Sequence, residues 1–164
     1  IDYKTGSFDP SPAAYYTGRS LQLELYLLAA CEGAKPAGAF YFPAEDKFTP
    51  PEDVKFRMQG FYNSDESVLA LLDNAGGEKS ALFDSAASRG MKEGEFADFL
   101  RYAKLVALRA REELRAGNVA PSPYEGSCDW CAFKGACGFA GAARRERGVR
   151  CAEIAAIARG EGNV

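Results

Sequence analysis

The sequence predicts an α/β fold in which helices flank a mixed sheet and a loop-rich, cysteine-bearing segment follows. Short apolar runs typical of buried strands alternate with longer stretches that have helical spacing. The 164 residues are 47% hydrophobic, which is enough apolar material for one compact domain. Three of the five cysteines lie close together near the end. We therefore expect a core over residues 1–117 and a cysteine-bearing segment with a C-terminal tail over residues 118–164.

The expected elements begin with a strand end at residues 1–4, followed by a turn and a loop that contains Pro10 and Pro12. Leucines at helical spacing predict a largely buried helix over residues 21–30. Residues 37–42 predict a buried strand. Because a domain does not normally start on a core strand, we expect that the complete protein has a further N-terminal portion.

The second half predicts one long helix, with apolar residues at helical spacing over residues 95–115. Asn63, three residues before an acidic residue, predicts a capping box. The expected elements are a strand near 55–61, a helix from Asn63 to about Asp73, a short strand at 79–83, the helix 95–115 and a last helix at 152–158.

The chain contains no histidine. This excludes histidine general bases, serine–histidine–aspartate triads and histidine-bound zinc. The chemistry must use carboxylates, lysines, thiolates or a bound metal. The sequence also lacks a run of apolar residues long enough to span a membrane and a signal peptide at its start, so we expect a cytoplasmic protein.

The charge is unevenly distributed along the chain. Residues 1–100 carry 9 basic and 16 acidic side chains, whereas residues 101–150 carry 10 basic and 5 acidic ones. The second stretch is the candidate surface for phosphate groups. Its basic run at residues 144–147, with Arg150, predicts either contact with a DNA backbone or an ordinary solvated segment.

The first chemical signal is Asp2 with Lys4. Residues two apart in a strand point to the same side of the sheet, so both side chains project into one site. A carboxylate can hold a divalent metal, and an ammonium beside it can orient water and stabilise charge on a phosphate. The alternative is a surface ion pair at a strand end. Gln22 and Tyr26, four residues apart on the next helix, share a face that can reach the same site.

The segments Ile1-Asp2-Tyr3-Lys4-Thr5-Gly6 and Gln22-Leu23-Glu24-Leu25-Tyr26 closely resemble the D-Y-K-T-G segment and the Q-L-x-x-Y helix of the RecB-like PD-(D/E)XK nuclease family. The resemblance implies the C-terminal part of a restriction-endonuclease-like core. It assigns Asp2 as an acidic ligand of Mg²⁺ or Mn²⁺ and Lys4 as the catalytic lysine. Gln22 and Tyr26 become supporting residues that contact DNA.

The family carries its first acidic ligand on an earlier strand, together with a further metal-binding residue on an earlier helix. Neither is present in these 164 residues. A hard cation needs several oxygen ligands. We therefore expect this chain alone to be nearly inactive, although the intact protein would be an enzyme.

The second chemical signal is Cys128, Cys131 and Cys137, whose spacing lets three thiolates converge on one metal centre. Without histidine, zinc would need a fourth cysteine or a carboxylate, while an iron–sulfur cluster takes thiolates directly. The alternative is three unrelated cysteines in a loop. Cys31 and Cys151 could serve in principle as a fourth ligand, but we expect one to be a small buried side chain and the other a surface thiol.

The cysteine spacing resembles the C-terminal knot of nucleases in this family that hold a 4Fe–4S cluster, notably the AddB-type component of AddAB-type helicase–nucleases. The resemblance implies a distant fourth cysteine before the nuclease core, so we expect the cluster to be absent or incomplete in this chain. It implies a DNA exonuclease that acts in double-strand-break repair and recombination, with DNA and a helicase partner of the AddA type. The alternatives are a non-catalytic iron–sulfur scaffold that binds DNA and a single-chain exonuclease of the CRISPR-associated kind.

Overall fold

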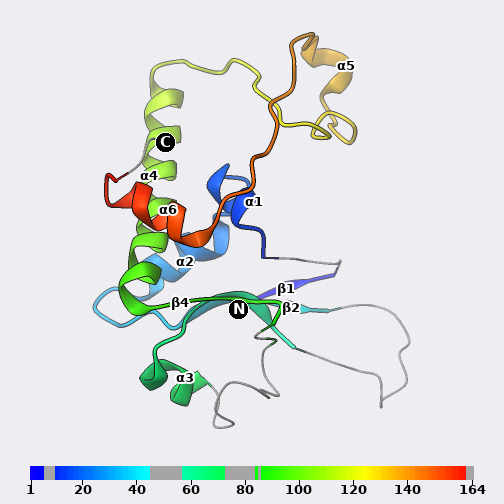
Figure 1. Ribbon diagram of the computed structural model, residues 1–164. Helices are drawn as coiled ribbons and strands as arrows, with labels where there is room; N and C mark the ends of the chain where they lie inside the picture. Colours follow the sequence, from blue (N-terminus) through cyan, green and yellow to red (C-terminus); the bar gives the residue numbers. More distant parts are fainter. Residues whose placement is uncertain (6–9, 45–56, 73–83, 85, 162–164) are drawn as a thin grey trace, which may run out of the picture.

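The computed structural model describes residues 1–5, 10–44, 57–72, 84 and 86–161 (Figure 1). Four strands form one sheet in the order β1-β2-β3-β4, with β1 parallel to β2, β2 antiparallel to β3, and β3 parallel to β4. The elements in chain order are β1 (Asp2–Lys4), α1 (Pro12–Tyr16), α2 (Gln22–Ala30), β2 (Gly38–Pro43), β3 (Gln59–Asn63), α3 (Glu66–Leu72), β4 (Arg89–Met91), α4 (Glu93–Arg115), α5 (Lys134–Cys137) and α6 (Cys151–Ala158). This mixed sheet with flanking helices confirms the predicted fold class.

The observed strands agree with those predicted from the sequence where the apolar runs are long enough to show a pattern. The predicted strands at residues 1–4 and 37–42 correspond to β1 and β2, and β3 begins at Gln59, later than expected. The predicted strand at 79–83 lies outside the described residues. Strand β4 was not predicted, because three residues are too few to show an alternation.

The long helices were predicted within about two residues of their ends, but two helix starts differ from expectation. Helix α1 occupies part of the predicted proline loop. The Ser11 hydroxyl accepts a hydrogen bond from the Ala14 amide at 3.3 Å, and Pro12 fits the first turn because its amide donor is not needed there. At α3, the Asp65 carboxylate accepts the hydrogen bond from the Ser67 amide. Asn63, the expected cap, instead ends β3.

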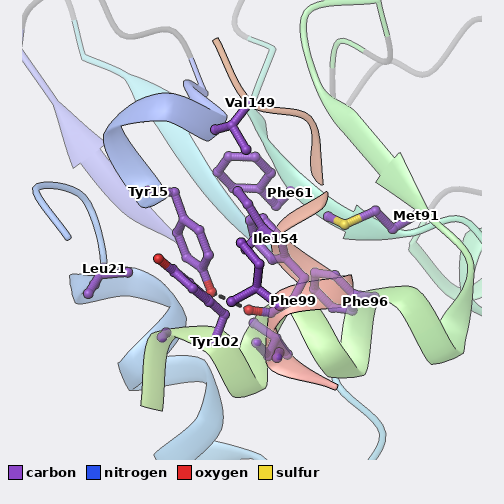
Figure 2. Packing of buried hydrophobic residues seen from close by; sticks show 13 residues of the cluster. Tyr15, Leu21, Phe61, Met91, Phe96, Phe99, Tyr102, Val149 and Ile154 are labelled. Atoms are coloured by element: carbon purple, nitrogen blue, oxygen red, sulfur yellow. Dashed lines mark hydrogen bonds between the residues drawn. The ribbon is translucent and has the colours of Figure 1, made fainter. Parts of the chain in front are cut away.

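The core lies between the sheet and helices α1, α4 and α6 (Figure 2). Tyr15 is fully buried, and its ring stacks on Phe99 with centroids 4.0 Å apart. The Tyr15 hydroxyl donates to the Phe99 carbonyl oxygen at 2.5 Å, so the buried phenol is satisfied. Phe61 of β3 packs against both rings.

Helix α6 completes the same core. Ile154 is fully buried, and Ile157 is 7% exposed. The C-terminal helix therefore packs with the core helices, although it follows the cysteine-bearing segment in the chain. The predicted division near residue 117 stays a prediction.

The stretch from residue 118 to residue 148 differs from the rest of the structure, because it contains no buried residue. It leads away from the sheet to α5 and then returns to α6 (Figure 1). None of the helices that the structure describes is long and apolar enough to cross a membrane.

Candidate active site

A small hollow lies where β1, β2 and the first turns of α2 meet. It is lined by Asp2, Gln22, Leu23, Tyr26 and Tyr41. The parallel register places Asp2 opposite Tyr41, and α2 starts at Gln22. Three of the four predicted site residues therefore line one hollow.

Lys4, the fourth predicted residue, lies beside this hollow. Its ammonium Nζ donates to Asp2 Oδ2 at 2.9 Å, and the two side chains are 40% and 41% exposed. The same ammonium lies 5.2 Å from the ring centroid of Tyr41. The hydrogen bond to Asp2 is the largest cause that raises the pKa of Lys4, so this side chain keeps its positive charge at neutral pH. The expected same-side projection of Asp2 and Lys4 is confirmed by their contact.

Gln22 and Tyr26 share a face of α2, as their spacing predicts. Gln22 Nε2 donates to the Tyr26 hydroxyl at 2.9 Å. Tyr26 is 61% exposed, which is unusual for an aromatic side chain and leaves it accessible to a ligand. The structure thus brings the four residues together, while their chemical roles stay predictions.

Two further residues belong to the surroundings of the hollow and were not predicted. Tyr41 is buried at 5% exposure, and a strand register would have been needed to place it opposite Asp2. Glu24 of α2 is fully buried, and neither carboxylate oxygen has a hydrogen-bond partner among the described residues. Burial raises the pKa of Glu24 to about 7. The burial of Glu24 could have been suspected from the sequence, because this acidic residue lies between four leucines.

The donor types at the hollow fit a hard divalent cation. Asp2 supplies a carboxylate, and Gln22 supplies an amide oxygen. Within the described part of the chain, no three or more Cys, Asp or Glu side chains are grouped so that they could hold a metal ion. The hollow therefore offers a partial ligand set among the described residues.

The cysteine-bearing segment presents free thiols. Cys131 and Cys137 are exposed, and Cys128 is half-buried. Turns connect them, with the Cys131 amide donating to the Cys128 carbonyl oxygen at 3.5 Å and the Cys137 amide to that of Phe133 at 2.9 Å. These soft donors fit an iron–sulfur cluster in chemistry and spacing, but in this structure they do not form a ligand group.

The other two cysteines lie at the start of α6 and at the end of α2. Cys151 packs against the core, and burial raises the pKa of its thiol to about 11. The expectation of a surface thiol at Cys151 was therefore wrong, because α6 turns this residue toward the core. Cys31 caps α2 and is half-buried.

Comparison with known families matches residues 1–138 to the PD-(D/E)XK nuclease superfamily. The chain belongs to this superfamily. The family predicted from the Asp2–Lys4 and Gln22–Tyr26 segments is thus confirmed, and the mixed sheet agrees with the α/β core of a PD-(D/E)XK nuclease.

Curated relatives of this PD-(D/E)XK chain are named as a subunit of an ATP-dependent helicase/deoxyribonuclease. The protein of Desulforudis audaxviator is 30% identical over 85% of this chain and 15% of the relative. That of Symbiobacterium thermophilum is 29% identical over 85% of this chain and 14% of the relative. That of Lachnoclostridium phytofermentans is 30% identical over 85% of this chain and 15% of the relative. The chain therefore spans about one seventh of the length of these relatives.

Proposed function

We propose that this chain carries the catalytic part of a metal-dependent deoxyribonuclease within a helicase–nuclease. The single observation that supports this most is the convergence of Asp2, Gln22 and Tyr26 at one hollow, with Lys4 in contact with Asp2 beside it. The names of the curated relatives support DNA as the substrate and a helicase as the partner. Exonucleolytic cleavage and a role in double-strand-break repair are part of this proposal.

The reaction we propose is hydrolysis of a phosphodiester bond. Asp2, with further oxygen ligands, would hold Mg²⁺ or Mn²⁺, which supplies Lewis acidity and lowers the pKa of a bound water. The Lys4 ammonium, 2.9 Å from Asp2, would orient the attacking water and stabilise negative charge that develops on the phosphate oxygens. Gln22 and Tyr26 would contact the DNA backbone and hold it over this pair.

The test is cleavage of linear DNA by the intact protein that contains this chain, with magnesium and ATP. We expect Asp2→Ala to reduce the rate by about 100-fold or more. Glu93→Ala is the matched control, because Glu93 forms an equally short ion pair with Lys35, at 2.9 Å, away from the hollow. A magnesium-dependent rate that Asp2→Ala leaves unchanged contradicts the proposal.

A non-catalytic scaffold that binds DNA is the competing function. It predicts that the unsubstituted protein, Asp2→Ala and Lys4→Ala behave alike in the cleavage assay. The single-chain exonuclease alternative predicts cleavage without a helicase partner. The same assay run with and without that partner therefore separates a single-chain exonuclease from a helicase–nuclease.

We also propose that Cys128, Cys131 and Cys137 ligate a 4Fe–4S cluster in the intact protein, with a fourth ligand from elsewhere. Their free thiols, exposed at Cys131 and Cys137 and half-buried at Cys128, support this assignment. Anaerobic reconstitution with iron and sulfide should give an intact protein with about four irons, and Cys131→Ala should lose most of them. The 164-residue chain alone should stay poor in iron, and a brown chain with a full iron complement would refute that expectation.

A further inference from the structure

A second cavity, distinct from the hollow at Asp2, lies between α1, α4 and the cysteine-bearing segment. Its volume is about 360 Å³, and its polar and aromatic lining comprises Tyr16, Tyr102, Arg109, Glu113, Tyr124 and Arg144. We call it the tyrosine–arginine cleft. A cavity of this volume lies at the small end of ligand pockets, which suits a single nucleotide unit and is too small for a duplex.

One wall of the cleft is a single face of α4. Tyr102, Arg109 and Glu113 follow one another at intervals of seven and four residues, so they lie along one side of the helix. Tyr102 is anchored, because its hydroxyl donates to the Tyr16 carbonyl oxygen at 2.8 Å. Arg109 lies above it at 63% side-chain exposure, with its Nε 3.1 Å from Glu113 Oε1.

The opposite wall is held by backbone hydrogen bonds across the cysteine-bearing segment. The Arg144 amide donates to the Pro123 carbonyl oxygen at 2.8 Å, and the Glu125 amide donates to the Arg144 carbonyl oxygen at 2.9 Å. These bonds form the bridge between Tyr124 and Arg144. These bonds hold residues 123–125 against Arg144, although none of these residues is buried.

Arginine–tyrosine contacts recur around the cleft. The Arg144 guanidinium lies 4.3 Å from the ring centroid of Tyr124, and that of Arg147 lies 5.0 Å from the ring centroid of Tyr16. A guanidinium stacked on a ring keeps N–H donors at its edge for a phosphate. Arg147 has no acidic partner within ion-pair distance in the described ranges.

Positive charge exceeds negative charge here. Four arginines surround the cleft, namely Arg19, Arg109, Arg144 and Arg147, against Glu113 and Glu146, which pair with Arg109 and Arg19. Guanidinium groups interleaved with aromatic rings are the combination that binds single-stranded nucleic acid, because the cations hold phosphates and the rings stack on bases.

The cleft is close to the hollow along the chain. Thr17 lines the cleft, and Gln22 lines the hollow. Five residues of protein chain span at most about 18 Å, so Thr17 and Gln22 are no further apart than this. A few nucleotides of a DNA strand cover the same length. Thr17 and Gln22 are therefore close enough for a few nucleotides of one DNA strand to span the distance between them.

We propose that the tyrosine–arginine cleft binds one strand of DNA a few nucleotides from the site of cleavage, with Arg109 and Arg144 at a phosphate and the half-buried rings of Tyr16 and Tyr124 against the adjoining base. This rests on the proposed function for the identity of the ligand. Binding by the cleft itself needs neither the metal nor Asp2.

The test is fluorescence anisotropy of a labelled oligothymidylate with the 164-residue chain, in the presence of a metal chelator. We expect Arg109→Gln and Arg144→Gln each to weaken binding about 5- to 10-fold and to lower the slope of log K against log salt by about 0.7. Tyr124→Leu should weaken binding about 10-fold with an unchanged slope. A duplex of the same length should bind at least about 10-fold more weakly than the single strand.

Two arginines outside the cleft serve as matched controls. Arg111 lies on the same helix and pairs with Glu112, and Arg145 adjoins Arg144 and pairs with Glu125. Arg111→Gln and Arg145→Gln should bind as the unsubstituted chain does. Equal binding by the cleft variants and these controls overturns the proposal, as does tighter binding of the duplex. Because Arg144 also donates to the Ser122 carbonyl oxygen, Arg109→Gln decides the outcome if Arg144→Gln unfolds.

The cleft and the nuclease proposal can fail separately. Loss of oligonucleotide binding in the cleft variants, together with cleavage that does not depend on Asp2, supports the cleft and removes the nuclease site. Cleavage that depends on Asp2, together with unchanged oligonucleotide binding in the cleft variants, removes the cleft alone.

Discussion

The hollow at β1 and α2 and the cysteine-bearing segment at residues 118–148 carry the two chemical motifs of this chain, but their physical support differs. The hollow rests on paired strands and on helix α2, which has buried residues such as Leu23 at 7% exposure. In the other region Trp130 is 96% exposed and Phe133 is 75% exposed. Apolar burial therefore fixes the first site before any ligand binds, whereas the second has backbone turns but no core.

The largest expected difference between the two regions is in the free energy of unfolding. Phe99→Ala removes a fully buried ring that stacks on Tyr15, so it should cost about 3–5 kcal/mol. Trp130→Ala should change the free energy of unfolding by less than about 0.5 kcal/mol, because the side chain buries almost nothing. Urea denaturation of the chain measures both. Similar costs for the two would mean that the cysteine-bearing segment is packed.

The buried carboxylate beside the hollow should make stability depend on pH. The pKa of Glu24 lies near 7 when folded, against an ordinary value of 4.5, so between these values the folded state binds one more proton than the unfolded state. Stability should therefore fall as pH rises from about 4.5 to about 7, by about 3 kcal/mol. Tyr15 and Tyr41 are the titratable groups coupled to Glu24, and burial raises the pKa of both, so they stay neutral in this range.

Glu24→Gln checks this expectation, because it keeps the shape and removes the titration. The free energy of unfolding of this variant should change little between pH 5 and pH 8. That of the unsubstituted chain should fall by about 3 kcal/mol. Asp129→Asn, in the exposed segment, is the control and should behave as the unsubstituted chain. If the stability of Glu24→Gln depended on pH in the same way as that of the unsubstituted chain, the Glu24 carboxylate would be solvated or paired.

A smaller effect should separate function from stability at the surface of the hollow. Tyr26→Phe removes the hydroxyl that accepts the hydrogen bond from Gln22, and Tyr26 is mostly exposed. We expect cleavage by the intact protein to slow by about 10-fold and the unfolding midpoint to stay nearly the same. A variant that keeps the full rate would place Tyr26 outside the DNA contact.

The same contrast explains which features the sequence could predict. The leucines of α2 and the apolar face of α4 repeat often enough to identify both helices, and the two-residue alternation of Asp2 and Lys4 predicted their contact. Helix α1 was missed although Ser11 and Pro12 are a helix start, because five residues show no apolar period. The position of Tyr41 depends on strand register, which is set by pairing between distant segments.

The cysteine-bearing segment shows what the sequence could not predict. Spacing predicted the ligand chemistry of Cys128, Cys131 and Cys137, but not whether the thiols meet. Without buried neighbours, their arrangement depends on bound ligand and partner groups more than on packing. The tyrosine–arginine cleft could not be predicted either, because the bridge between Tyr124 and Arg144 joins residues twenty apart.

Lys4 is the side chain on which the proposed cleavage site depends most, and Lys35 is closely matched to it. Lys4 and Lys35 have the same side-chain exposure of 40%, the same ion-pair distance of 2.9 Å and pKa values raised for the same reason, a hydrogen bond to a carboxylate. The decisive measurement is the single-turnover rate of DNA cleavage by the intact protein with Lys4→Ala and with Lys35→Ala. We predict a loss of about 100-fold or more for Lys4→Ala and an unchanged rate for Lys35→Ala. Equal rates in the two variants would contradict the assignment of the hollow as the cleavage site.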